Sequence, residues 1–481
     1  MPLSTLPNIA RHPAKFDCLK QPEVLQLEGL EFTPFHLITL ILFVCAVLHT
    51  LSVHKIHQKA RDMEAKQLST KEARKSPRSL IVQGLYFLSE IEIIFAIWAI
   101  PLFITISLFY GLPVAVEYMN TRDYTEALFI VVILTITSTR PIVHMAEQFI
   151  AFLAKKMGGS LSVWWFTLLT VGPILGSFIT EVGSMALCAL LLSRQFYSYQ
   201  PSPKLAYATL ALLFVNISVG GLLTNFASPA VLVLAHCWDW TAGDMFFDFG
   251  WKAIIGILFS NLLYYLYFKK EFILLNAKQR SSGKLFITPI SEAVPPWVIY
   301  AHVFFIFWIV AASHYPAIFF ASFIVFLGFY HSTRDHQYSL NLVRPLMVGI
   351  FLAGLVIHGG LQGWWVIKAL KGLTPLGVMG MAMTLTAFND NTAISYLAIL
   401  VPNWGDAYQY AVFTGVVAGG GLTVIANAPN PAGYVILKSH FPQGISPIRL
   451  FLAALIPTII LYALFYFLGP VFLDKLVTYL F

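Results

Sequence analysis

The segment TLTAFNDNTAISYLAILV, residues 384–401, places polar residues between two apolar flanks. Its centre, Asn389-Asp390-Asn391-Thr392, holds one carboxyl, two amides and a hydroxyl. Such groups are costly to bury in hydrocarbon unless they are paired or hydrogen-bonded. The segment therefore predicts a polar break within a membrane-embedded stretch, for which other parts of the chain must supply partners.

The composition of the whole chain indicates a membrane protein. Of its 481 residues, 58% are hydrophobic and only 11% are charged, and the mean hydropathy is +0.74. These values exclude an ordinary soluble domain and predict an all-α polytopic membrane protein. In a membrane protein the net charge of +7 reflects where the loops lie, and it does not indicate binding to nucleic acid. The four cysteines form no Cys-x-x-Cys pair, and we expect inert thiols.

Apolar runs recur along the chain at lengths that suit membrane crossings. Two segments, 160–192 and 373–402, are too long for one crossing, and each has a polar break near its middle. About ten further runs are predicted to cross once: 32–53, 81–112, 124–140, 205–235, 252–268, 297–313, 317–330, 345–362, 408–437 and 450–468.

The basic residues orient these crossings. Loop 54–80 carries eight Lys and Arg residues, so we assign it to the cytoplasm and the N-terminus to the outside. Fourteen more of the 30 basic residues fall in loops on the same side, whereas the outside loop 236–250 carries three Asp. This distribution agrees with the positive-inside rule.

Segment 160–192 is predicted to enter and leave the membrane on the same side. Lys155 and Lys156 precede it, and Arg194 and Lys204 follow it, so both ends carry the cytoplasmic signature. Each arm has about 15 residues, fewer than the roughly 20 of a spanning helix. We therefore expect a re-entrant hairpin with its tip near 176–181; two thin full crossings would give the same end points.

The two halves of the chain carry matching motifs. GSFITEVGSMAL (176–187) parallels TAFNDNTAISYL (386–397), and TNFASPA (224–230) parallels ANAPNPA (426–432). Each half thus contains three crossings, a hairpin, a crossing broken by Gly and Pro, and one more crossing. The first half starts outside and the second inside, which predicts an inverted-topology repeat. Broken segments at matching places in such repeats point to a binding site.

Four acids lie well inside apolar spans: Glu90, Glu92, Glu181 and Asp390. We expect no Lys or Arg at a comparable depth. Carboxylates without a fixed cation favour Na⁺ or H⁺, whereas an anion needs cations or helix N-termini. The alternative is that Glu181 and Asp390 have a purely structural role, in which their carboxyls cap the free N–H groups of broken helices. Glu90 and Glu92 cannot share a helix face, and they serve either a scaffold or dimer contact or a proton relay.

The predicted site combines the tips of the two hairpins with the breaks of the two Gly/Pro-broken crossings. Amides and hydroxyls there either form hydrogen bonds with unpaired backbone groups or offer an oxygen ligand to an ion. Sodium is expected at Asp390, Asn391 and Asn427. The full predicted set for ion or substrate binding is Thr180, Glu181, Asn225, Ser228, Asn389, Asp390, Asn391, Thr392 and Asn427.

These motifs resemble those of the ion transporter superfamily, which contains arsenite permeases, dicarboxylate/sodium symporters and NhaD-type antiporters. From about residue 30 to 470 the chain looks most like its bacterial sodium/proton antiporter family. The resemblance implies an elevator-type transporter, a homodimer in the bacterial inner membrane, with Na⁺ and H⁺ as its ions. It implies no enzyme activity, no further cofactor and no nucleic-acid partner. In the dicarboxylate branch the tips read Ser-Asn-Thr; Thr180-Glu181-Val182 and Asp390-Asn391-Thr392 introduce acids there, which favours cations.

The resemblance also implies a domain organisation: an extracytoplasmic segment (1–30), scaffold helices (31–159 and 297–372), a transport domain (160–268 and 373–468), a cytoplasmic linker (269–296) and a tail (469–481). An alternative function is a sodium-coupled symporter of a small organic acid or inorganic anion. In that case Asp390 would help to hold Na⁺, and the N-termini of broken helices would hold the anion.

Overall fold

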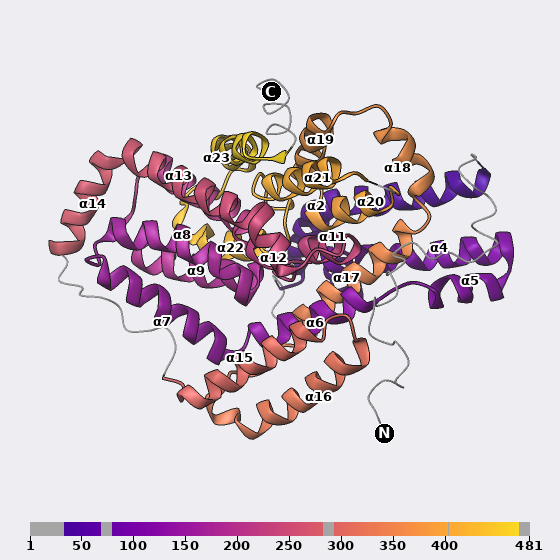
Figure 1. Ribbon diagram of the computed structural model, residues 1–481, viewed down its shortest axis with the longest axis horizontal. Helices are drawn as coiled ribbons and strands as arrows, with labels where there is room; N and C mark the ends of the chain where they lie inside the picture. Colours follow the sequence, from indigo (N-terminus) through magenta and orange to yellow (C-terminus); the bar gives the residue numbers. More distant parts are fainter. Residues whose placement is uncertain (1–32, 69–78, 282–292, 403, 471–481) are drawn as a thin grey trace, which may run out of the picture.

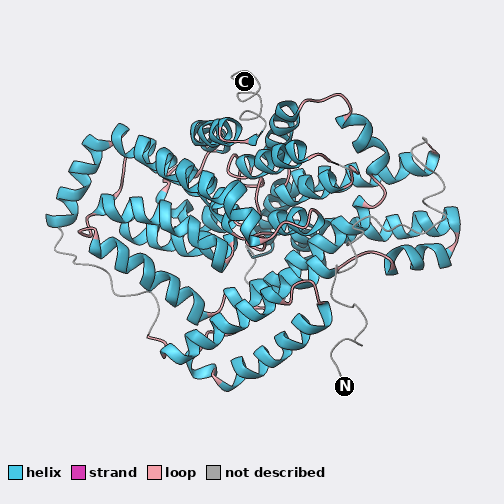
Figure 2. Ribbon diagram, in the orientation of Figure 1, coloured by secondary structure: helices cyan, strands magenta, loops and turns pink. Residues whose placement is uncertain are grey.

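The computed structural model describes residues 33–68, 79–281, 293–402 and 404–470. Over these ranges every regular element is a helix (Figures 1 and 2), which confirms the predicted all-α class. The predicted segment 1–30, part of the linker and most of the tail lie outside the described residues.

The helices of the first half precede a gap in the described chain at 282–292. In order they are α2 (Pro34–Leu68), α3 (Leu80–Leu88), η3 (Ile91–Ile93), α4 (Ile94–Tyr110), α5 (Leu112–Asn120), α6 (Thr125–Thr137), α7 (Arg140–Lys156), α8 (Leu161–Ile179), α9 (Glu181–Gln195), η4 (Tyr197–Tyr199), α10 (Pro203–Gly220), η5 (Gly221–Leu223), α11 (Pro229–Cys237), α12 (Ala242–Asp244), η6 (Met245–Gly250), α13 (Trp251–Tyr267) and α14 (Lys269–Ser281).

The helices of the second half follow that gap. They are α15 (Pro296–Ala311), α16 (Pro316–Ser332), η7 (Arg334–His336), α17 (Val343–Gly359), α18 (Gly363–Leu370), α19 (Pro375–Phe388), α20 (Asn391–Ile399), α21 (Asp406–Gly419), α22 (Asn430–Leu437), η8 (Lys438–His440) and α23 (Pro447–Phe467).

Six helical stretches of the described chain are long and apolar enough to cross a bilayer. The number rises to eight if each of two bent pairs is one span: α6 with α7, bent by 63°, and α17 with α18, bent by 80°. The finer count of ten crossings and two re-entrant hairpins stays a prediction. The six stretches are Pro34–Val53, Ile91–Tyr110, Leu161–Ile179, Pro203–Leu223, Ala242–Tyr267 and Pro447–Phe467.

One crossing predicted to be unbroken, 81–112, is interrupted, and another, 124–140, is followed by a sharp turn. The run 81–112 breaks after α3, where the N–H of Ser89 bonds back to the carbonyl of Tyr86 (3.0 Å) and η3 leads into α4. The run 124–140 ends with α6 at Thr137, and the chain turns into α7, whose second residue is Pro141. Proline suits a first helical turn because its missing N–H is not needed there. The predicted crossing 81–112 is therefore wrong as one continuous helix, whereas the predicted crossing 124–140 agrees with α6 and ends at the turn into α7.

The two crossings predicted to be broken by Gly and Pro are broken in the structure. α10 ends at Gly220, and α11 begins at Pro229. α21 ends at Gly419, and α22 begins at Asn430 with Pro431 in its first turn. The intervening residues carry backbone groups that no helix satisfies, so side chains and neighbouring carbonyls must do so.

Helix α10 lies at the centre of the molecule. Every residue from Leu205 to Gly220 is buried, and the helix packs against α8, α9 and α13 from its own half and α21 and α23 from the other. A Cβ on Gly421, just after α21, would come within 2.3 Å of the Cα of Val215 on α10. The two halves therefore interlock through close backbone contact at this helix.

The expectation that the cysteines are inert thiols is wrong for Cys237, which is disulfide-bonded. Cys45 and Cys188 are free. Sequence spacing reveals only local pairs, whereas a disulfide requires closeness in space.

Candidate ion-binding site

The first predicted tip lies between α8 and α9, which pack along each other. The hydroxyl of Ser184 on α9 donates to the carbonyl of Gly172 on α8 (2.6 Å), so the helices run back past one another. Thr180 alone separates them, with φ 64° and ψ 155°. This conformation is almost restricted to glycine. The chain thus holds a β-branched residue in a strained position directly before the buried Glu181.

The second predicted tip lies between α19 and α20. Asp390 caps α20, because its Oδ1 accepts the N–H of Thr392 at 2.8 Å. The N–H of Asp390 itself bonds to the side-chain oxygen of Asn389 (3.0 Å). Asn389 and Asp390 are less than a tenth exposed, and Asn391 and Thr392 are about 1% exposed. All four polar residues of the opening segment are therefore buried inside the protein.

Each tip is tied to the broken crossing of its own half in a similar way. The N–H of Glu181 donates to the carbonyl of Ala227 (3.0 Å), and the N–H of Asn391 donates to that of Ala426 (3.0 Å). Threonine hydroxyls reinforce both contacts: Thr224 donates to the carbonyl of Ser177 (2.6 Å), and Thr423 donates to that of Ala387 (2.9 Å). Backbone groups that the helices leave unpaired at the breaks and tips are thereby hydrogen-bonded across the two segments.

Asn427, in the break of the second half, reaches the acid at the tip of the first half. Its side-chain N–H donates to Oε2 of Glu181 (2.8 Å), and Ser228 also bonds to this carboxyl. The other carboxyl oxygen of Glu181 and the Oδ1 of Asn427 are buried without a hydrogen-bond partner. Buried polar atoms of this kind are uncommon in folded proteins, and they are candidates for binding a ligand.

A cavity of about 40 Å³ lies beside the second tip. This volume exceeds what one water needs. Asp390, Thr392 and Asn427 bring its polar groups from the second half, and Glu92 contributes a second carboxyl from η3. The remaining lining residues are Ile91, Pro229, Val348, Phe351, Val424, Ile425, Ala428 and Pro431.

The charges around this cavity are mainly negative. Asp390 interacts electrostatically with Glu92 and with Glu181. None of the residues that line the cavity is Lys or Arg, although the charge of Arg344 acts on Glu92. Carboxylate and amide oxygens without a lining cation favour a hard cation or a proton over an anion.

The prediction that no Lys or Arg lies deep within an apolar span is wrong for Lys252, which stands inside the span Ala242–Tyr267. Arg122, Arg140 and Lys252 are each less than a tenth exposed. They lie elsewhere: Lys252 donates from Nζ to the hydroxyl of Tyr410 (3.3 Å), and the guanidinium of Arg122 lies 4.5 Å from the ring centre of Tyr118. Contact with aromatic faces stabilises buried cations.

Of the nine predicted binding residues, three line the cavity: Asp390, Thr392 and Asn427. The other six do not, although five of them are buried: Thr180, Glu181, Ser228, Asn389 and Asn391. Asn225 matches Asn427 in the repeat, but its side-chain N–H donates to the carbonyl of Trp240 (3.2 Å). Glu90 is exposed and does not line the cavity, unlike Glu92. Among the described residues no three His, Cys, Asp or Glu side chains group as a metal site. A sodium site here would therefore draw on amide, hydroxyl or carbonyl oxygens beside Asp390.

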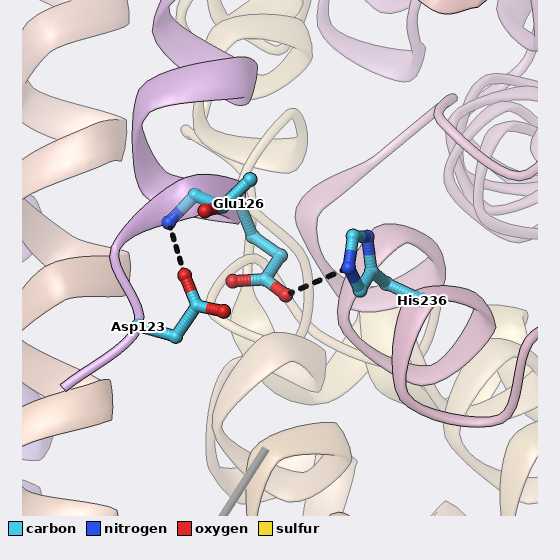
Figure 3. Close-up of polar contacts among 4 residues, drawn as sticks. Asp123, Glu126 and His236 are labelled. Carbon is cyan, nitrogen blue, oxygen red and sulfur yellow. Dashed lines mark hydrogen bonds and ion pairs between the residues drawn. The ribbon is translucent and has the colours of Figure 1, made fainter. Parts of the chain in front are cut away.

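One buried acid escapes the sequence interpretation. Glu126 stands in the first turn of α6, at 8% exposure, with Oε1 3.8 Å from Nε2 of His236 at the end of α11 (Figure 3). It sits at the edge of a predicted crossing, and its partner is far away in sequence. Only the rule that charged groups near apolar runs need partners could have marked it.

The fold and the cavity define a class: a multi-pass helical membrane protein whose broken helices meet at buried carboxyls, as in secondary transporters. A family model described as "Putative Na+/H+ antiporter" matches residues 34–468. The chain belongs to this family, which is one of transporters and not of enzymes, and the predicted membership is confirmed. No curated protein matches the chain.

Proposed function

We propose that the chain exchanges Na⁺ for H⁺ across the membrane, with Asp390 and Glu181 as the groups that carry the exchanged charge. The observation that carries this proposal is the position of Asn427. One end of its amide donates to Glu181, and the same residue lines the cavity that holds Asp390. A cation bound by the amide oxygen would thus be coupled to both acids.

In the proposed exchange, Na⁺ lies in the cavity with the ionised Asp390 and the oxygens of Asn427 and Thr392, which line it. Oxygen ligands of this kind suit a hard cation. When Na⁺ leaves, a proton takes its place on the carboxyl, so that the cavity returns across the membrane without an uncompensated buried charge. Glu92 provides a carboxyl through which that proton can reach the cavity.

We propose an elevator mechanism for the movement between the two sides. The cavity wall combines residues of the predicted transport domain with Glu92 and Phe351 from the predicted scaffold. A surface shared in this way can open on either side when one part slides along the other. The homodimer remains an expectation from the resemblance.

The anion symporter is less well supported. An anion would use the free N–H groups at the starts of broken helices, and side chains already accept from one such group at three of these starts, although not at α22. Thr180 accepts from Gly183 at α9, Ser228 accepts from Val231 at α11, and Asp390 accepts from Thr392 at α20.

Proteoliposomes with a trapped pH dye test the proposal. Addition of Na⁺ outside should drive protons out of vesicles that contain the wild-type chain. Asp390→Asn should abolish this movement, because the amide neither ionises nor exchanges a proton. Glu90→Gln, an exposed acid outside the cavity, is the matched control and should retain exchange. Intact exchange by Asp390→Asn would refute the assignment, and uptake of a labelled anion in place of exchange would favour symport.

A further inference from the structure

A second pair of titratable groups lies apart from the Asp390 cavity. Glu126 belongs to α6, His236 belongs to α11, and both residues are 8% exposed. Figure 3 shows the carboxylate of Glu126 directed at the imidazole, with 3.8 Å between Oε1 and Nε2. This distance is longer than a direct hydrogen bond, so the two groups can still approach each other.

Further charged and titratable groups lie near the pair. The carboxylate of Asp123 accepts the N–H of Thr125 (2.9 Å) at the start of α6 (Figure 3). The ring of His314, between α15 and α16, lies 5.1 Å from that of His236. Within the described ranges, the groups that act on one or other member of the pair include Asp123, Asp239, His314 and Tyr396, with Arg122 near Tyr396.

A small cavity gives water a place beside Glu126, the acid of the pair. Its volume is about 20 Å³, which is room for about one water. Glu126, Asp123 and Arg122 line it together with Val233 of α11 and Tyr396 of α20. A water there has several polar partners, so it can deliver a proton to the carboxylate and take one away.

Helix α11 connects this pair to the first tip. Ser228, the cap at its start, bonds to the carboxyl of Glu181, and His236 lies in its last turn. The nine residues of the helix span only about 13 Å. α11 also packs against α20, whose N-cap is Asp390. Whatever holds the end of α11 therefore restrains both tips.

We propose that Glu126 and His236 form a second proton-binding site, which holds α11 against α6 when it carries one proton. The ligand is a proton delivered by water. With one proton the pair is either a carboxylate facing an imidazolium or a carboxylic acid facing an imidazole, and both arrangements attract. Without it, a carboxylate faces a neutral ring and the attraction is weaker. The proton belongs to the pair as a unit.

The inference rests on the proposed function in one respect, namely that α11 moves relative to α6 during transport. Under that condition, acid at this end of the molecule should hold α11 and slow the exchange. Coupling between two sites typically changes an equilibrium about fivefold or more.

Hydrogen exchange in nanodiscs tests the site without any need for transport. In Na⁺-free buffer, acidification from about pH 8 to about pH 6, the range in which histidine titrates, should raise the protection of the α11 amides about fivefold after correction for intrinsic rates. His236→Gln and Glu126→Gln should each abolish this rise. His331→Gln and Glu117→Gln, which alter exposed residues, should retain it.

A rise that survives in both pair variants, or one that is absent from the wild-type chain, would overturn the proposal. In proteoliposomes, acid should slow Na⁺/H⁺ exchange more in the wild-type chain than in His236→Gln. If no chain exchanged Na⁺ for H⁺ while the hydrogen-exchange result held, the proposed function would fail and the proton site would stand.

Discussion

At the scale of single residues, Asn427 links the acids of the two halves. It donates to Glu181 and lines the cavity of Asp390, while its own oxygen has no hydrogen-bond partner. An amide can serve both purposes because it carries a donor and an acceptor at opposite ends. Aspartate would place a third carboxyl in the same space, and leucine would supply neither group.

Replacement of Asn427 tests this link. Asn427→Ala should weaken the apparent affinity for Na⁺, because an oxygen ligand is lost, and should lower the free energy of unfolding by about 1–3 kcal/mol, because an acceptor of Glu181 stays buried without its donor. Sodium titration of exchange and thermal unfolding in detergent measure the two effects. Asn225→Ala, at the matching repeat position, should leave the Na⁺ affinity unchanged; an equal loss there would show that both halves bind the ion.

The sequence predicts the acids of this site better than their partners. Asp390 and Glu181 stand out because a carboxyl in an apolar run demands an explanation. Asn225 follows from the repeat, yet the two halves have diverged, and its amide bonds to Trp240 instead. Glu126 is missed because its pairing with His236 depends on how α6 and α11 pack, which no local pattern encodes.

At the scale of helices, close packing depends on glycine where the halves meet. Gly421 faces the backbone of α10 so closely that any side chain would displace it. Small residues of this kind let membrane helices approach until their backbones touch. The closeness brings the break of the second half, and with it Asn427, within reach of the first tip.

Gly421→Ala should therefore destabilise the fold by about 1–3 kcal/mol, the usual cost of overpacking. Gly84→Ala is the matched control. Nothing lies within 4 Å of a Cβ built there, and inside α3 alanine should stabilise by about 0.5–1 kcal/mol. Thermal unfolding of both variants in one detergent gives the comparison. A neutral Gly421→Ala would mean that α10 and the chain after α21 can move apart freely.

The helix breaks show what apolar runs reveal and what they hide. Gly and Pro predict the ends of α10 and α21 because both residues disfavour helix interiors. The break at Ser89 is absent from the prediction, since a run of apolar residues gives length without direction. Ser-Glu within 81–112 is the local signal that could have indicated it.

At the scale of the whole molecule, the acids from both halves converge on one region. Glu92 comes from the predicted scaffold, Glu181 from the first tip and Asp390 from the second. Such convergence costs stability, because like charges repel in a medium of low dielectric constant. A bound cation, or protons, would offset this repulsion.

Sodium should consequently stabilise the folded chain. At a hundred times the dissociation constant the gain is about 2.7 kcal/mol, visible as a higher unfolding temperature relative to K⁺ at equal ionic strength. The gain should shrink as the pH falls, because protons compete with Na⁺ for Asp390, and should be absent in Asp390→Asn. Stabilisation by Na⁺ that persisted in this variant would place the ion elsewhere.

The burial of α10 also has a consequence for the synthesis of the chain. The hydroxyl of Ser218 donates to the carbonyl of Val417, 199 residues later in the sequence. At about 5–20 residues per second, a ribosome needs about 10–40 s to make that stretch. During this interval α10 has entered the membrane, but the surfaces that finally enclose it do not yet exist. The central packing around α10 can therefore form only after α21 has been synthesised. A nascent chain that stalls before α21 should be a substrate for membrane proteases.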